Sequence, residues 1–125
     1  MRVQFWLSAL ACWLIGSGLI AAAMAAHLAV DVKLQKLVET AVLIQLTQGA
    51  AVLAAAQSRS INLRWPASLA LIGCLVFCGS LYARAAGLID TAPLAPLGGG
   101  LMIVSWFAAG LLFITAPLQH PDPDL

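Results

Sequence analysis

Four long apolar runs, separated by three short polar breaks, fill almost the whole chain. The runs cover residues 3–26, 37–56, 65–86 and 97–116. A hydrocarbon core about 30 Å thick is crossed by about 20 helical residues, and each run reaches that length. Because lipid offers no hydrogen-bond partner to the backbone, each run is expected to close its own hydrogen bonds as a helix. The pattern therefore predicts an all-α membrane protein with four transmembrane helices.

The polar breaks are short, at residues 27–36, 57–64 and 87–96. Connections of this size place sequential helices side by side and antiparallel, which predicts one antiparallel bundle. The predicted domain covers residues 1–118, and residues 119–125 form a short polar tail rich in Pro and Asp. Short segments with alternating polarity, which transmembrane strands would show, are absent from the sequence.

Composition agrees with a membrane protein, because 62% of the residues are hydrophobic and only 9% are charged. That leaves too little polar surface to cover a soluble globule. The net charge of +1 and the lack of a basic patch argue against a nucleic-acid partner. The expected localisation is a membrane, which the protein crosses several times.

Lysines and arginines are divided equally between the two sides, so the positive-inside rule gives a tie. One side carries Arg2, Arg59 and Arg64, and the other carries Lys33, Lys36 and Arg84. The N-terminal amine and the usual dominance of the first helix favour a cytoplasmic location for both termini.

The first apolar run has an alternative interpretation as a cleaved signal peptide. It follows Arg2 and ends near Ala23-Met24-Ala25, which has the small-residue pattern of a cleavage site. However, the run is longer than the 7 to 15 apolar residues typical of a signal peptide. We therefore expect it to remain as the first membrane span.

Small residues recur at every fourth position in two of the runs. Such stripes let helix backbones approach closely in lipid, so they predict packing within the bundle or, alternatively, a seam between subunits. Glycines at the start of the fourth run predict a close approach to another helix, with a pliable hinge as the alternative. The predicted packing residues are Gly18, Ala22, Ala26, Gly79, Ala83, Gly87, Gly98 and Gly99.

Three polar side chains, Gln45, Gln48 and Ser80, fall inside the predicted spans. The two glutamines are three residues apart on one helical face, so they predict hydrogen bonds between helices. The alternative is a polar lining for a substrate or ion path. Tyr82 and Arg84, near the end of the third run, are expected to anchor that helix at the membrane interface.

No set of residues predicts a cofactor, a metal site or catalysis. Cys74 and Cys78 share a helical face but lack further ligands, and Cys12 stands apart from both. His27 is expected at the interface, bonded within the protein and without a metal, because the other histidine, His120, lies in the tail. A catalytic triad and paired buried carboxylates are also missing, so the protein is not expected to be an enzyme.

Several motifs together resemble a known family. They are the run of residues 22–27 ending in His27, the Cys-Gly-Ser-Leu-Tyr run at 78–82, the Ala-Pro-Leu-Gly-Gly run at 95–99 that contains Pro96, and Trp106. The chain resembles the small four-helix membrane family called domain of unknown function 423, which includes YgdD-type bacterial proteins and animal transmembrane protein 256. The resemblance implies a four-span protein of the bacterial inner membrane with no established biochemical activity.

The chain departs from the family pattern at several positions. Ala22 and Ala25 stand where the family has glycines, and Ser105 replaces a glycine beside the tryptophan. In the second helix, the family's Tyr-Gln followed by His corresponds here to Ile44, Gln45 and Gln48, so any chemistry that needs the second histidine would be lost. Glutamine can still donate or accept a hydrogen bond at that position. The resemblance thus implies a divergent member.

The expected function is that of a non-catalytic accessory or stabilising subunit that packs against a larger membrane complex. Its expected partners are the lipid bilayer and other membrane subunits or further copies of itself. The alternative is a small oligomeric transporter or channel. Four-span drug exporters of that kind carry a carboxylate in the first span, and this first span has no acidic residue.

Overall fold

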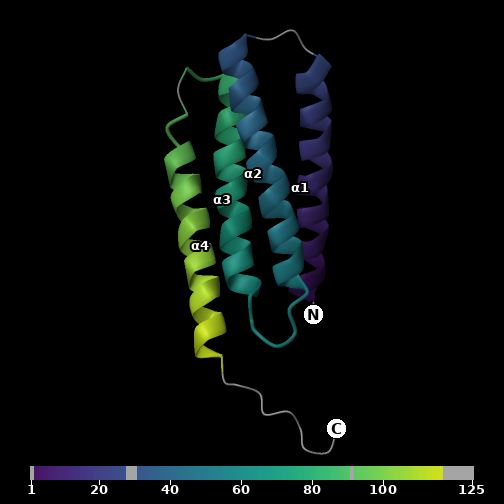
Figure 1. The fold of residues 1–125 in the computed structure, drawn as a ribbon, viewed down its shortest axis with the longest axis vertical. Helices are drawn as coiled ribbons and strands as arrows, with labels where there is room; N and C mark the ends of the chain where they lie inside the picture. Colours follow the sequence, from purple (N-terminus) through teal and green to yellow (C-terminus); the bar gives the residue numbers. More distant parts are fainter. Residues whose placement is uncertain (1, 28–30, 91, 117–125) are drawn as a thin grey trace, which may run out of the picture.

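The computed structural model describes residues 2–27, 31–90 and 92–116, and it confirms the predicted all-α bundle. The four helices are α1 (Arg2–His27), α2 (Val32–Ala56), α3 (Arg64–Ala85) and α4 (Ala95–Thr115) (Figure 1). All four are long and apolar enough to cross a membrane. The predicted tail at 119–125 lies outside the described residues.

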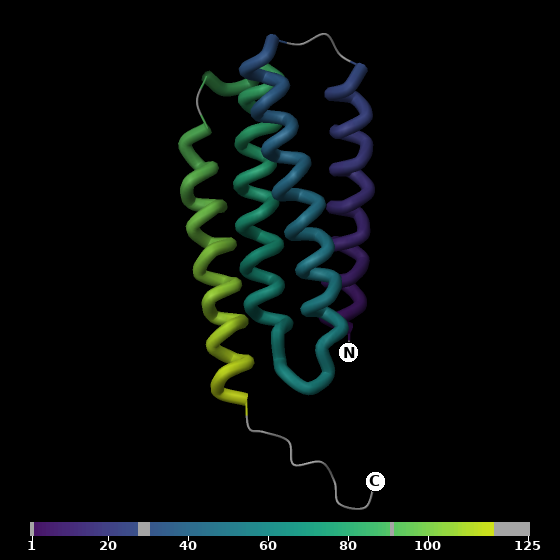
Figure 2. The backbone as a smooth tube through the Cα atoms, viewed as in Figure 1, coloured from purple at the N-terminus to yellow at the C-terminus, as the bar shows by residue number. Residues whose placement is uncertain are grey.

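The helices alternate in direction and stand in a row in chain order (Figure 2). Each helix packs against its neighbours in the sequence, and α1 also reaches α3, whereas the described parts of α1 and α4 make no contact. The N-terminus, the α2–α3 connection and the end of α4 lie at one end of the molecule. The bundle is therefore open, with two outer helices that each leave a wide face uncovered.

Helix α2 begins earlier than its apolar run, at Val32 and not at residue 37. The added turn carries Lys33, Gln35 and Lys36, which are good helix formers. Its first backbone bond joins the Gln35 amide to the Asp31 carbonyl at 2.9 Å. The apolar run marks only the part of the helix that lipid covers, so it does not include this polar first turn.

Helix α3 ends in a Schellman motif, in which Gly87 takes a positive φ of 74°. The Leu88 amide donates to the Ala83 carbonyl at 3.0 Å, and the Gly87 amide donates to the Arg84 carbonyl at 3.1 Å. Gly87 is therefore needed to end the helix. The prediction that it packs against another helix is wrong, since a Cβ there would meet no atom within 4 Å.

The closest approach between helices joins α3 to α4 through two glycines. A Cβ added to Gly98 would lie 2.6 Å from the Gly73 carbonyl oxygen and 2.6 Å from the Phe77 amide nitrogen. A Cβ on Gly73 would in turn lie 2.8 Å from the Gly98 carbonyl oxygen. Gly49 plays the same part between α2 and α1, where a Cβ would meet Ile15 at 2.6 Å. Glycine thus sets the distance between neighbouring helices.

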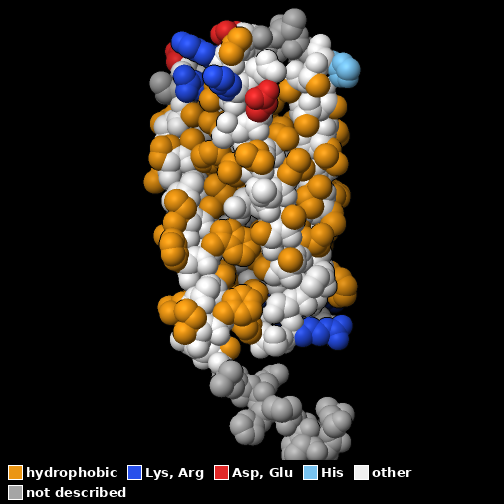
Figure 3. Space-filling model, viewed as in Figure 1, with side chains coloured by type: hydrophobic (Ala, Val, Ile, Leu, Met, Phe, Trp, Pro, Cys, Tyr) orange, Lys and Arg blue, Asp and Glu red, His pale blue; other side chains and the backbone are white. Residues whose placement is uncertain are grey.

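Large apolar side chains cover the outside of the bundle, as expected of a surface that faces lipid. Trp13 and Phe107 are each 78% exposed and Ile114 is 82% exposed. Figure 3 shows apolar side chains over the middle of the drawn face, with the charged groups at its two ends. This distribution matches a hydrocarbon layer bounded by two polar interfaces.

We expect Gly98→Ala to destabilise the bundle, because the added methyl group would collide with the backbone of α3. Overpacking of this kind typically costs about 1–3 kcal/mol. Thermal unfolding in a mild detergent measures the effect. Gly100→Ala is the matched control, since a Cβ at Gly100 would meet no atom within 4 Å. Equal stability of the two variants would contradict the role assigned to the glycine contact.

Candidate functional site

The most polar point of the interior is Gln45, whose side chain connects three helices. It is 4% exposed. Its amide nitrogen donates to the Leu14 carbonyl oxygen at 2.8 Å and to Ser17 Oγ at 2.7 Å, both on α1. Its carbonyl oxygen accepts a hydrogen bond of 2.7 Å from the Tyr82 hydroxyl on α3. Gln45 therefore satisfies its own buried amide and joins α1, α2 and α3 at one junction.

Gln48, one turn further along α2, connects to a different helix. Its carbonyl oxygen accepts a hydrogen bond of 2.7 Å from the indole nitrogen of Trp106 on α4. These side chains line a hollow of about 540 Å³, whose other lining residues include Phe77 and Met102. The two glutamines share one side of α2, yet between them they reach all three other helices.

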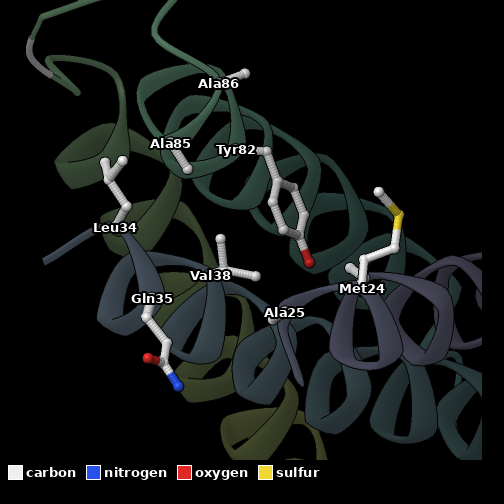
Figure 4. Close-up of a pocket in the computed structure, with 9 residues that line it drawn as sticks. Met24, Ala25, Leu34, Gln35, Val38, Tyr82, Ala85 and Ala86 are labelled. Atoms are coloured by element: carbon white, nitrogen blue, oxygen red, sulfur yellow. The ribbon is translucent and has the colours of Figure 1, made fainter. Parts of the chain in front are cut away.

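An apolar cavity of about 290 Å³ lies next to the junction, between α1, α2 and α3. Figure 4 shows Tyr82 extending from α3 with its hydroxyl directed inward, between Val38 and Met24, while the amide of Gln35 points away. Apart from Tyr82 and Gln35, the lining is aliphatic or thioether. The cavity suits hydrocarbon better than a polar substrate, because few groups in it could orient polar atoms.

The expected anchoring role of Tyr82 is wrong, because its hydroxyl is used inside the bundle and does not reach toward the interface. A tyrosine near a helix end often lies at the interface, where water or headgroups bond to its hydroxyl. Here the hydroxyl finds a buried acceptor on a neighbouring helix instead. Arg84, in the last turn of α3, is exposed as a snorkelling residue should be. Pro96 occupies the first turn of α4, where its missing amide hydrogen costs nothing.

The small-residue stripes are only partly used inside the chain. Gly18 faces α2, where a Cβ would meet Leu46 at 3.1 Å, and Ala22 is half-buried. Ala26 is exposed and lines a hollow between α1 and α2, so its predicted role in packing stays a prediction. Intramolecular packing is also wrong for Gly79, where a Cβ would meet no atom within 4 Å.

Two further members of the predicted packing set lie at contacts between α3 and the rest of the chain. Ala83 is half-buried beside the start of α4, in a hollow that Leu94 also lines. At Gly99 a Cβ would meet the Phe77 ring at 3.7 Å, an ordinary contact. Around Gly79, the small-residue stripe on α3 is thus not covered by another helix of the chain.

The reactive side chains do not form a site. Cys74 and Cys78 are buried with their sulfurs 3.8 Å apart, and the Cys78 thiol donates to the Ala41 carbonyl oxygen at 3.3 Å. Ser80 is 7% exposed, and its hydroxyl has no hydrogen-bond partner among the described residues. His27 is exposed at the end of α1. The described residues provide no hydrogen bond to its ring, so its bonding within the protein stays a prediction. Within those same ranges no three His, Cys, Asp or Glu side chains are grouped as a metal site would require.

Sequence reasoning missed Gly73, Gly49 and Ser17, which complete the contacts described above. Gly73 and Gly49 stand outside any regular stripe, and Ser17 resembles an ordinary helical serine that bonds to the Leu14 carbonyl oxygen at 3.0 Å. The sequence does not distinguish a glycine that packs against another helix from a glycine that faces lipid. Only the rotation of each helix about its axis separates them.

We expect Gln45→Leu to lower the free energy of unfolding by about 2 kcal/mol, since it breaks three hydrogen bonds, each worth about 0.6 kcal/mol and at most about 1.7 in a membrane. Tyr82→Phe should lower the free energy of unfolding by a smaller amount in the wild-type protein, and by almost nothing in the Gln45→Leu variant. Unfolding of the four proteins of this double-mutant cycle in detergent gives the coupling free energy, expected at about 0.6 kcal/mol for the one shared bond. Thr47→Val is the control, since Thr47 bonds only within α2. Simple additivity would contradict a shared junction.

Comparison with known proteins places the chain in a family. The family described as "Protein of unknown function (DUF423)" matches residues 21–99, which include His27, Gln45, Gln48 and Tyr82 and end before Trp106. No curated protein and no solved structure matches the chain. Because the match covers more than half of the sequence, the chain belongs to the family of proteins of unknown function DUF423.

Proposed function

We propose that this four-helix membrane protein is a non-catalytic accessory subunit that stabilises a larger complex in the bacterial inner membrane. The observation that carries the proposal is the use of its interior polar groups. Both intramembrane glutamines are engaged with other helices, so the polar chemistry of the interior serves assembly. The nearby cavity is lined almost entirely by apolar groups.

The outer surface supports a role in association. Gly16 on α1, Gly79 on α3 and Gly100 on α4 each have open space where a side chain would be, and each lies on an exposed part of its helix. In lipid, helices associate through close backbone contact and dispersion forces, which exposed glycines permit. The uncovered faces of α1 and α4 add further room for partner helices.

The alternative is a small oligomeric transporter or channel. The open row leaves a groove that Gln48 lines, and copies of the chain could close this groove into a path. Against it, the described acidic residues Asp31, Glu39 and Asp90 are all exposed near one end of the bundle. Carriers that couple protons to substrate use a carboxylate at membrane depth. The accessory role therefore has the stronger support.

We expect Gly79→Leu to detach a partner without weakening the isolated chain, because the new side chain would project from the exposed face of α3. Mass analysis of the intact particle, purified in mild detergent from native membranes, should show a defined heteromer for wild type and the single chain for the variant. Leu75→Ala is the control on the same face of α3 and should retain the partner, because it shortens an exposed side chain and adds no bulk. A single chain in the wild-type preparation would contradict the subunit role.

We further expect neither wild type nor the Gln45→Leu, Gln48→Leu double variant to conduct ions. The measurement is proton and cation flux into liposomes that contain the purified protein, compared with empty liposomes. Flux through the wild type that disappears in the double variant would establish the transporter and refute the accessory role, because apolar walls dewet a narrow passage.

A further inference from the structure

The two ends of the bundle differ in whether described carboxylates lie near their lysine and arginine side chains. At the end with the α1–α2 connection, Lys33, Lys36 and Arg84 share the surface with described carboxylates. At the other end, Arg2, Arg59 and Arg64 have no carboxylate near them in the segments that the structure describes. On the drawn face of Figure 3 the upper end carries red and blue groups, and the described part of the lower end shows a blue group. Among the described residues, the excess positive charge is thus concentrated at the end where α1 and α3 begin.

A hollow of about 790 Å³ lies at this positive end, between the start of α1 and the α2–α3 connection. Arg59 and Arg64 line it, together with the neutral polar side chains of Gln4, Ser60 and Asn62. It is the most polar of the cavities described above. Several hydrogen-bond donors and two positive charges therefore converge on one space.

Backbone geometry adds to the positive potential of the hollow. Helix α3 begins at Arg64, and Leu63 before it provides no side-chain cap for the first amides. One partial substitute is Asn62, whose side-chain oxygen Oδ1 accepts a hydrogen bond of 3.4 Å from the Arg64 backbone amide. The positive end of a helix dipole therefore points at the same region as the two guanidinium groups.

The hollow also lies at the depth of lipid headgroups. Phe5 lines it and is 70% exposed, and Trp6 and Trp65 at the same end are 70% and 47% exposed. Exposed aromatic rings gather at the boundary between hydrocarbon and headgroups. A ligand held there could place acyl chains along the apolar faces of α1 and α3.

We propose that this hollow binds the phosphate headgroup of an anionic phospholipid, with Arg59 and Arg64 as the phosphate-binding residues. Guanidinium groups match phosphate oxygens in charge and geometry. A zwitterionic headgroup brings its own ammonium group and would leave the excess positive charge uncompensated. A phosphatidylglycerol headgroup carries a net negative charge, and its hydroxyls find partners in Gln4, Ser60 and Asn62. The proposal is independent of the accessory function.

The test is native mass spectrometry of the detergent-purified protein titrated with phosphatidylglycerol or phosphatidylcholine. Wild type should retain phosphatidylglycerol at least tenfold more tightly than phosphatidylcholine. Arg59→Gln with Arg64→Gln should weaken phosphatidylglycerol binding about 10- to 30-fold, as expected from the loss of two cations near an anionic lipid. Arg59→Lys with Arg64→Lys should keep most of the affinity. Circular dichroism checks that each variant is folded.

Two control variants separate a built site from general surface charge. Arg2→Gln removes a cation at the same end but outside the lining of the hollow, and Lys33→Gln with Lys36→Gln removes two cations at the opposite end. Both should bind phosphatidylglycerol within about threefold of wild type. Losses equal to that of the Arg59 and Arg64 variant would overturn the proposal.

Two further measurements test whether a soluble anion or the tail carboxylates fill the hollow. Millimolar inorganic phosphate should not displace the lipid, and displacement would assign the hollow to a soluble anion. Asp122→Asn with Asp124→Asn should leave the affinity within about threefold. A tenfold gain in that variant would mean that the tail carboxylates fill the hollow, and it would overturn the lipid assignment.

Discussion

The whole arrangement depends on one constraint, which is that the side-chain amide of a glutamine in hydrocarbon must find its partners on another helix. Gln45 meets it by bonding to α1 and α3 at once. Gln48 meets it through Trp106, so α2 is connected to every other helix by its two glutamines. Apolar packing by itself would tolerate many rotations of four such helices, since lipid and leucine are equally apolar. The glutamine bonds select one of them.

Close approach is the second requirement, and glycine provides it where backbones cross. Gly73 and Gly98 bring α3 against α4, and Gly49 brings α2 against α1. Hydrogen bonds and glycine contacts are complementary, because the first fix helix rotation and the second fix helix separation. Both intramembrane glutamines and several glycines hold the bundle together, which leaves few groups for chemistry and supports an architectural role.

The family resemblance acquires a physical meaning in this geometry. The tyrosine of the Gly-Ser-Leu-Tyr motif and Gln45 of α2 are partners in one hydrogen bond. Gln48 stands where the resemblance implies a histidine, and its carbonyl oxygen accepts from the indole of Trp106. A neutral imidazole nitrogen could accept the same bond. The divergent positions of this chain can therefore keep the contact while losing a titratable group.

The sequence by itself determined the number, type and approximate extent of the helices, because about 20 apolar residues in lipid have few alternatives to a helix. It also indicated which polar residues needed partners inside the membrane. Only the tertiary structure decided which partners they found, that Tyr82 turns inward, and that Gly98 packs while Gly79 faces outward. The physical reason is that an apolar residue has the same hydropathy whether it faces lipid or packs inside the protein. The rotation of each helix, which separates these two environments, is set by contacts between residues far apart in the chain.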